Sequence, residues 1–381
     1  MNGKIIAIAA VVVIIAAAAG ATVFIGDDGE DVKKGGLYEL NAKIIDVDMG
    51  GMSGTPKVID TLEMMYHAVY GDFAEGTDKL TISDAKTDSE FWSKYCTYDH
   101  LAKVESDGTI RYHTVADEKM TLVEKTLPAN GANKLIATGS AYAFTQYYMI
   151  CAKYNVEPFS DEASKNSELL KEFQSLNYAG LMLDDIKTSS EKLASLYPAD
   201  YKSRCGSIKT YDLEMIGQDV KDAGAGGNTV IVMGSGTINK KNNAQVLSTI
   251  ENNGGHMLLN NAKSIPETFA MVEEIGIVLG YSEYVDEVIE GLELQLYKIY
   301  YSLQQHADEK HKAYFEGSSG KASGKTGSGY SLCGDFFGWD VSLFDGAEHD
   351  TENLLQEKPD IILFYTNDER SMDVKMRISS V

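Results

Sequence analysis

The sequence is poor in the residues that build disulfide frameworks and zinc knuckles. Its four cysteines, Cys96, Cys151, Cys205 and Cys333, are widely separated in a chain of 381 residues, and no CxxC pair occurs. This spacing excludes a dense disulfide scaffold and a cysteine-based zinc site. We expect the cysteines to be mostly buried small apolar residues, with one disulfide as the main alternative.

Catalytic and metal-binding patterns are also lacking. The seven histidines have no short-range spacing typical of metal ligands, and only His256 and His311 border predicted strands. No nucleophile–base pair and no paired carboxylates in a recognisable frame are found. The sequence therefore predicts neither a histidine metal cage nor an enzyme.

Positive charge is scarce. The 34 lysine and arginine residues are outnumbered by 57 aspartate and glutamate residues, which gives a formal net charge of −23. This balance argues against a nucleic-acid or anionic-lipid partner and favours a soluble, self-repelling surface. We expect no nucleic-acid partner, and we expect the protein to be a monomer.

Long apolar runs are absent except at the N-terminus, where residues 5–25 contain no charged residue. This length spans a bilayer core of about 30 Å, which favours an uncleaved anchor. Cleavage as a signal peptide after Ala19-Gly20-Ala21 is the alternative, and no cysteine follows the run to carry a bacterial lipid anchor. We expect residues 1–26 to be an anchor or signal peptide, residues 27–36 a linker, and the remainder to be extracytoplasmic, either anchored or secreted.

Residues 37–120 carry no recognisable chemistry. A short strand is expected at 42–47, and a helix is expected to begin at Pro56 after the N-cap Thr55. A hairpin is expected over residues 101–113, turning at Asp107-Gly108. We expect these residues to form a small α+β accessory module of unknown role.

A regular alternation of strands and helices begins after residue 120. Apolar strands are expected at 134–137, 229–233 and 256–259, with helices between them and small polar loops after them. The intervening residues 157–177 are polar, and we expect a solvated insertion there. This pattern predicts a parallel α/β lobe over residues 121–281 that binds ligand at the carboxyl ends of its strands.

One long helix is expected at Ser282–His306. The stretch has no proline, its apolar residues recur at three- and four-residue steps, and its length is about 37 Å. After it, residues 307–381 predict a second α/β lobe with two evident strands, at 313–315 and 360–365. This second lobe looks truncated.

Two loops resemble known binding motifs but lack residues that those motifs require. A calcium loop beginning at Asp46 has Lys57 at its twelfth position, where a bidentate carboxylate is required. A phosphate loop at residues 319–326 has Ser319 in place of the first glycine, and Gly327-Ser328-Gly329 stands where a helix must begin. We therefore expect no nucleotide binding, although the loop's lysines could contact an anionic ligand.

The ordered landmarks of the chain resemble one family, the solute-binding proteins of ABC importers for iron–siderophore complexes, haem and cobalamin. No single landmark is highly specific, and the resemblance depends on their order from about Met120 to Val381. The landmarks are residues 134–140, 211–216, 229–233, 264–280, 312–316, 338–340 and 352–362.

The resemblance implies the fold and the partners. It implies two parallel-sheet α/β lobes joined by a single long bridging helix, with ligand held between them and no cofactor of the protein's own. The implied partners are an ABC permease with its ATPase and a small-molecule metal chelate, and the N-terminal segment would add a membrane contact. Relatives commonly use a glutamate early in the helix after the first cleft loop for permease docking; here residues 141–146 contain none.

The resemblance also implies which residues contact ligand. Aromatic faces would stack on a macrocycle or catecholate, small polar residues would donate hydrogen bonds, and an arginine would pair with a chelate carboxylate. The expected ligand-binding residues are Ser140, Tyr142, Ser235, Thr237, Glu316, Tyr330, Trp339, Tyr365, Asn367 and Arg370.

A second interpretation remains open. A membrane-anchored surface sensor or interaction protein could reuse the same binding fold without delivering ligand to a permease. The expected accessory module and the absence of the docking glutamate both favour this alternative.

Overall fold

In the computed structural model, the chain divides into two compact units. Unit 1 comprises residues 1–49, 59–87 and 294–381, and unit 2 comprises residues 50–58 and 88–293. The structure describes residues 42–47, 54–138, 140–180, 191–197, 212–235, 243–260, 262–316, 321–325, 327–349 and 351–365.

Unit 2 contains a four-stranded parallel sheet with the strand order β6-β5-β7-β8. The three predicted strands are confirmed as β5 (Lys134–Ala137), β7 (Val230–Ser235) and β8 (His256–Asn260). The fourth strand, β6 (Asn177–Gly180), was not predicted. All described carboxyl ends of this sheet therefore lie along one edge.

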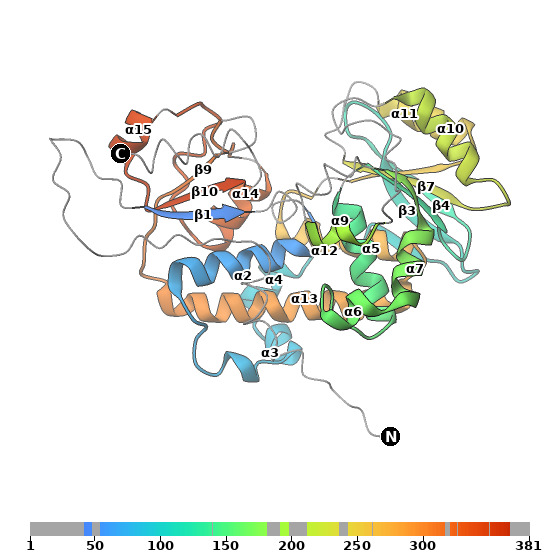
Figure 1. Cartoon of the computed structure of the whole chain (residues 1–381). Helices are drawn as coiled ribbons and strands as arrows, with labels where there is room; N and C mark the ends of the chain where they lie inside the picture. The colour runs from blue at the N-terminus through green and yellow to red at the C-terminus, as the bar shows by residue number, and fades with distance from the viewer. Residues whose placement is uncertain are drawn as a thin grey trace, which may run out of the picture. The chain divides into compact units, whose positions relative to one another are not determined.

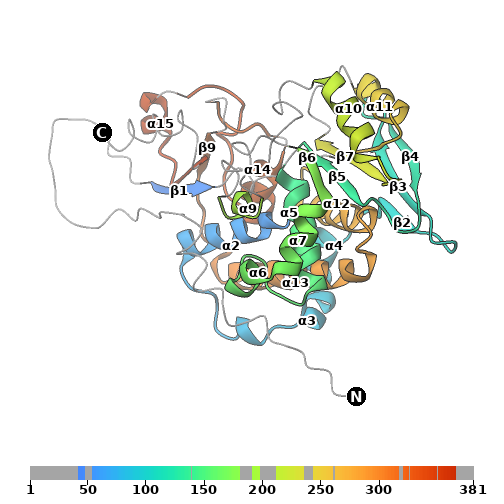
Figure 2. The same cartoon turned by 45° about the vertical axis from the view of Figure 1, so that its right-hand side comes forward.

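Helices cover both faces of this sheet, which explains why β5, β7 and β8 are largely apolar. Helices α10 (Leu213–Ala223) and α11 (Asn243–Asn252) pack on alternate strand residues such as Val230 and Val232 (Figure 2). The intervening residue Ile231 is also fully buried. Helices α5 (Ser140–Lys153), α7 (Ser167–Leu176) and α12 (Ile265–Val278) complete the covering layers.

The expectation of a solvated insertion at residues 157–177 was wrong. This segment forms α6 (Asp161–Lys165) and α7, and α7 leads directly into β6. Leu169, Phe173 and Leu176 are buried although polar residues surround them in the sequence. Their spacing of four and three residues is the helical signal that the overall polarity obscured.

The predicted hairpin is part of a three-stranded antiparallel sheet in unit 2. Its strands are β2 (Ala102–Val104), β3 (Ile110–Val115) and β4 (Leu122–Leu127). The hydroxyl oxygen of Thr114 on β3 accepts a hydrogen bond from the amide of Leu259 on β8 at 3.0 Å. The antiparallel sheet thus lies against the β8 side of the parallel sheet.

Unit 1 contains a three-stranded parallel sheet, with β1 (Lys43–Val47), β10 (Ile361–Tyr365) and β9 (Ala313–Glu316) in that order (Figure 1). Strands β9 and β10 confirm the two strands expected after the long helix. The third strand, β1, pairs in parallel with β10, so that Val47 lies opposite Tyr365. This strand comes from the segment that was expected to form a separate module.

Residues 37–120 are in fact distributed over both units. Besides β1, unit 1 takes residues 59–87, which include most of α2 (Lys57–Tyr70), the short 3-10 helix Thr77–Lys79 and α3 (Ile82–Thr87). Unit 2 takes residues 88–120, beginning with α4 (Ser89–Tyr95). Thr55 accepts a hydrogen bond from the amide of Lys57 at 3.1 Å, as expected for the N-cap of α2.

The long helix α13 runs over Ser282–Leu303 and continues as a 3-10 turn, Gln304–His306. Its predicted apolar residues Val285, Leu292 and Leu296 are buried. Glu293, a charged residue of the same helix, is also buried, at 4% exposed. The division between the two units falls inside this helix, after Glu293. Its role as a bridge stays a prediction.

The remaining helices are short: α9 (Glu191–Ser195), α14 (Ser328–Tyr330), a π-helical turn (Ser331–Phe336) and α15 (Thr351–Glu357). Within the part of the chain that the structure describes, no helix is long and apolar enough to cross a membrane. The expected N-terminal anchor, residues 1–26, lies outside that part.

Three of the cysteines are buried and free, as expected: Cys96, Cys151 and Cys333. Burial raises the pKa of each thiol, that of Cys151 to about 12, so these thiols stay protonated and unreactive near neutral pH. Cys205 lies outside the described residues.

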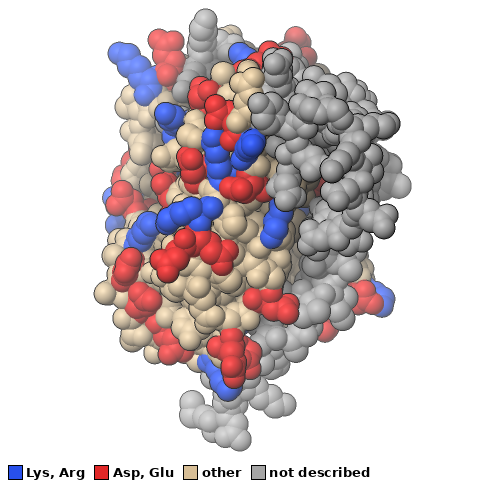
Figure 3. All heavy atoms as spheres, turned by 90° about the vertical axis from the view of Figure 1, so that its left-hand side faces the viewer, with Lys and Arg blue, Asp and Glu red and all other residues tan. Residues whose placement is uncertain are grey.

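Acidic side chains are scattered over one face of the molecule. On the face drawn in Figure 3, the described aspartate and glutamate side chains lie apart from one another, with lysine and arginine side chains among them.

Candidate functional site

The carboxyl edge of the unit 2 sheet brings together several of the predicted ligand-binding residues. Ser140 is the first residue of α5, directly after the turn that follows β5. Ser235 is the last residue of β7, the strand beside β5, and Asn260 lies opposite it at the end of β8. In a parallel sheet, this edge is where ligands bind.

Thr138 and Tyr142 hold the turn after β5 against the end of β7. Both the amide and the hydroxyl of Thr138 donate to the carbonyl oxygen of Met233, at 2.9 and 2.8 Å. The hydroxyl of Tyr142, which is 2% exposed, donates to the carbonyl oxygen of Gly234. Two neighbouring carbonyls of β7 thereby have hydrogen-bond donors, which fixes the backbone at the end of β7.

The described residues along this edge carry no formal charge. They are Thr138, residues 140–142, residues 233–235 and residues 258–260. At its polar positions, the described part of this edge carries residues with hydroxyl or amide groups.

In unit 1, Glu316 and Tyr365 are the last residues of neighbouring parallel strands, β9 and β10. Glu316 is 2% exposed and accepts a hydrogen bond from the hydroxyl of Tyr314 at 3.1 Å. Burial, and then the negative charge of Glu316, raise the pKa of Tyr314, so the phenol remains a donor. The chain then folds back, and Ser323 donates its amide to the carbonyl oxygen of Phe315 at 2.7 Å.

Tyr330 lies where α14 passes into the π-helical turn Ser331–Phe336, and it is half-buried. π-Helical turns widen the helix by one residue and occur frequently at functional sites. The turn is stabilised by buried residues on its inner side, including Leu332, Cys333 and Phe336. The partial exposure of Tyr330 is compatible with a ligand contact.

Trp339 lies deeper than the sequence suggested. Its side chain is 3% exposed, its indole nitrogen donates to the hydroxyl of Tyr70 at 2.9 Å, and its ring stacks on Phe337 with 4.5 Å between centroids. In this position the indole ties the end of α2 to the segment after the π-helical turn. Contact between Trp339 and a ligand stays a prediction.

Three of the predicted ligand-binding residues, Thr237, Asn367 and Arg370, lie outside the described residues. Sequence reasoning did not select Asn260, although it ends a predicted strand at the same edge as Ser235. Asn260 could have been selected from the sequence by its position at the carboxyl end of a strand, where such sheets bind ligands.

Among the described residues, no three histidine, cysteine, aspartate or glutamate side chains come together in a way that could hold a metal ion.

No protein-family model matches the sequence, and no curated protein sequence matches it either. Solved structures similar to this chain include binding proteins. One is a periplasmic binding protein from Veillonella parvula DSM 2008, at 14% identity and a TM-score of 0.47, covering 74% of this chain and 82% of that one.

Two further structures are similar. The iron-uptake ABC transporter substrate-binding protein PiuA from Streptococcus pneumoniae Canada MDR_19A has 14% identity and a TM-score of 0.41, covering 70% of this chain and 78% of that one. The TroA-like periplasmic binding protein FepB from Veillonella parvula has 15% identity and a TM-score of 0.45, covering 66% of this chain and 69% of that one.

Proposed function

We propose that this protein is the extracytoplasmic solute-binding component of an ABC importer and that it captures a metal chelate such as a ferric siderophore, haem or cobalamin. The observation that carries the proposal is the set of neutral polar residues at the carboxyl edge of the unit 2 sheet, held by Thr138 and Tyr142. The order of the sequence landmarks supports the same class. A permease with its ATPase would receive the ligand.

The carboxyl edges of the two sheets, taken separately, carry different kinds of groups. At the unit 2 edge, Ser140 and Ser235 would donate hydrogen bonds, with Thr237 continuing that loop. In unit 1, Tyr330 and Tyr365 would offer aromatic faces, Asn367 and Arg370 polar and cationic groups, and Glu316 and Trp339 would support the loops that carry them. Aromatic surface with a few oriented polar groups is the usual composition of a small-molecule site.

Equilibrium dialysis and calorimetry with ferric siderophores, haemin and cobalamin test the proposal. We expect one class of chelate to bind, and we expect the Ser140→Ala/Ser235→Ala double variant to bind it about tenfold more weakly, because two hydrogen bonds of about 0.5–1.5 kcal/mol each are removed. Ser248→Ala, on the exposed side of α11, is the matched control and leaves affinity unchanged.

Tryptophan fluorescence adds a local readout. In a Trp92→Phe variant, Trp339 is the remaining tryptophan, since the sequence contains two. A chelate bound in unit 1 near Tyr330 would alter its emission. A folded protein that binds none of the three chelate classes would exclude the transport proposal.

Delivery separates transport from the sensor alternative. If the protein is an importer component, deletion of its gene lowers cellular uptake of the chelate that it binds. Binding in vitro with unchanged uptake would instead favour a surface sensor that uses the same fold.

A further inference from the structure

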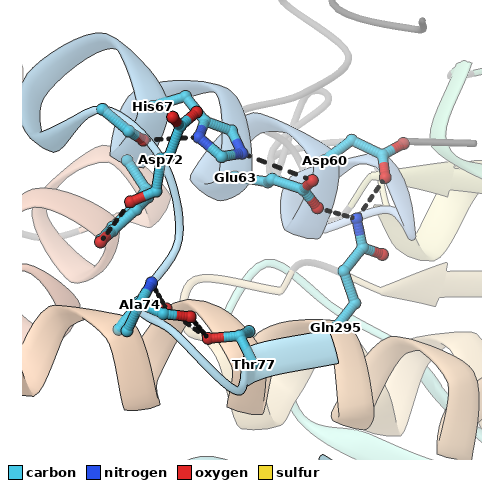
Figure 4. A network of polar contacts seen from close by, with 10 residues as sticks. Asp60, Glu63, His67, Asp72, Ala74, Thr77 and Gln295 are labelled. Atoms are coloured by element: carbon cyan, nitrogen blue, oxygen red, sulfur yellow. Dashed lines mark hydrogen bonds and ion pairs between the residues drawn. The ribbon is translucent and has the colours of Figure 1, made fainter. Parts of the chain in front are cut away.

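One face of α2 carries a carboxylate and an imidazole one helical turn apart. Glu63 and His67 are four residues apart, and the Nε2 atom of His67 lies 3.8 Å from the Oε1 atom of Glu63 (Figure 4). This distance is too long for a hydrogen bond. The two facing atoms are therefore far enough apart for one ion to contact both.

The other ring nitrogen of His67 determines which tautomer is present. Its Nδ1 atom lies 2.7 Å from the carbonyl oxygen of Gly71, and because a carbonyl can only accept, Nδ1 carries the hydrogen. In the neutral ring, Nε2 then presents its lone pair toward Glu63. A backbone carbonyl that fixes one nitrogen while the other stays available is the usual arrangement of a metal-ligating histidine.

The carboxylate of Glu63 is held just as firmly. Its side chain is 7% exposed, and its Oε2 atom accepts a hydrogen bond from the side-chain amide of Gln295 at 2.7 Å (Figure 4). The same amide group donates to Asp60 at 3.1 Å. Among the described residues, Oε1 of Glu63 is buried and has no hydrogen-bond partner. A buried polar atom without a partner costs free energy, so the arrangement calls for a cation at this position.

Two other histidine–carboxylate pairs among the described residues differ on this point. His100 contacts both oxygens of Glu273, at 2.8 and 2.9 Å. The oxygen of Asp345 that faces His349 also accepts the amide of Ala347 at 2.8 Å. In these pairs a proton on the imidazole suffices to satisfy the carboxylate. The geometry at Glu63 leaves an oxygen that such contacts do not fill.

We propose that Glu63 and His67 together bind a divalent transition-metal ion, with water molecules at its remaining positions. Two ligands at about 2.1 Å from a tetrahedral ion lie about 3.4 Å apart, so the observed 3.8 Å closes with a shift of a few tenths of an ångström. One imidazole nitrogen and one carboxylate oxygen suit zinc and its neighbours in the first transition row. Gln295 acts as a positioning residue that orients the carboxylate.

The proton is the competitor for this site. A metal ion binds only a neutral imidazole, so metal binding weakens as the pH falls. With two protein ligands, the site is weaker than a structural zinc site, so its occupancy depends on the available metal.

Cobalt titration tests the site because Co²⁺ bound to an imidazole absorbs visible light. With the tag-free full chain near neutral pH, we expect a saturable absorption band that Zn²⁺ abolishes by competition. His67→Gln and Glu63→Gln lose at least about tenfold in affinity, and Gln295→Leu loses about tenfold, as is typical when the partner of a ligand is removed. His100→Gln, which breaks an ordinary histidine–glutamate pair, leaves affinity unchanged.

A measurement on the unaltered protein guards against variants that misfold: Zn²⁺ is expected to slow hydrogen exchange of the last turn of α2. The proposal is overturned if the wild type binds neither Co²⁺ nor Zn²⁺, or if folded His67→Gln binds them as tightly as the wild type. The first result would mean that a proton on His67 alone balances Glu63. The second would place the ion at another histidine.

Discussion

The two parallel sheets obtain their strands from the chain in opposite ways. In unit 2, β5, β6, β7 and β8 follow one another between residues 134 and 260, with helices between them. In unit 1, β9 and β10 come from the C-terminal part of the chain, whereas β1 comes from residues 43–47. One sheet is assembled from neighbouring segments and the other depends on a pairing between distant ones.

This difference determines where local sequence patterns succeed. Consecutive strands usually lie near one another, so an alternation of strands and helices predicts which strands belong to the same sheet. A strand that pairs far along the chain leaves no such pattern, and β1 looked like part of a separate module. The unit 1 sheet therefore appeared to have two strands when it has three.

The largest expected effect comes from removing core side chains in each sheet. Ile45 on β1 and Ile136 on β5 are 1% and 0% exposed. We expect Ile45→Ala and Ile136→Ala to cost about 2–5 kcal/mol each, because buried apolar surface is lost and a cavity remains. Hydrogen exchange resolved by peptide should show faster exchange in β10 for the first variant and in β7 for the second.

The control for this pair is Thr126→Ala, an exposed position on β4, which should change stability by no more than about 0.5 kcal/mol. If Ile45→Ala left the exchange of β10 unchanged, β1 would not be an integral strand of the unit 1 sheet. The unit 1 sheet would then consist of the two strands that the sequence suggested.

A smaller effect is expected at the carboxyl edge of the unit 2 sheet. Tyr142→Phe removes the hydroxyl that donates to the carbonyl of Gly234 and leaves that buried acceptor without its donor. The cost should be about 1–3 kcal/mol, and chelate affinity should fall because the end of β7 is no longer fixed. Denaturant unfolding followed by a unit 2 probe would measure the first effect and equilibrium dialysis the second.

The matched control is Tyr301→Phe, which also removes a tyrosine hydroxyl, but from a residue that is 37% exposed. Equal effects of the two variants would show that the Tyr142 hydroxyl does not position the edge. Loss of stability without loss of affinity would mean that the ligand does not depend on the end of β7.

The sequence was sufficient for elements with strong local signals. The strands at 134–137, 229–233 and 256–259 and the long helix from Ser282 were found because burial on both faces or on one face leaves a periodic apolar pattern. Strand β6 was missed because Asn177–Gly180 is short and carries polar and small residues. Its position is determined by pairing with β5, which no local pattern reveals.

The candidate site was predictable only in part. Ser140 and Ser235 could be selected because each lies at the carboxyl end of a recognisable strand. The tie between Tyr142 and Gly234 joins residues 92 positions apart, and the stacking of Trp339 on Phe337 depends on the turn between them. The pair Glu63 and His67 could not be recognised as a site from the sequence. The orientation of the Glu63 carboxylate depends on a hydrogen bond from Gln295, a residue far along the chain.

The smallest expected effect is the change in the stability of unit 2 with acid. In unit 2, the carboxylate of Glu172 accepts hydrogen bonds from Lys153 and from the hydroxyls of Tyr154 and Tyr281, at 2.8, 3.0 and 2.8 Å. Burial raises the pKa of Glu172, but these three hydrogen bonds together outweigh burial and lower it below the ordinary value of 4.5. These hydrogen bonds join α5, α7 and Tyr281, the residue before α13.

Because the pKa of Glu172 is lower in the folded state, its contribution to stability is fully present above pH 4.5 and is lost as the pH falls through the folded-state pKa. A Glu172→Gln variant should therefore be less stable than the wild type near neutral pH, and the difference should shrink in acid. Glu168→Gln on the same helix is the control, since Glu168 is exposed. A difference that stayed constant with pH would mean that Glu172 acts through packing rather than through its charge.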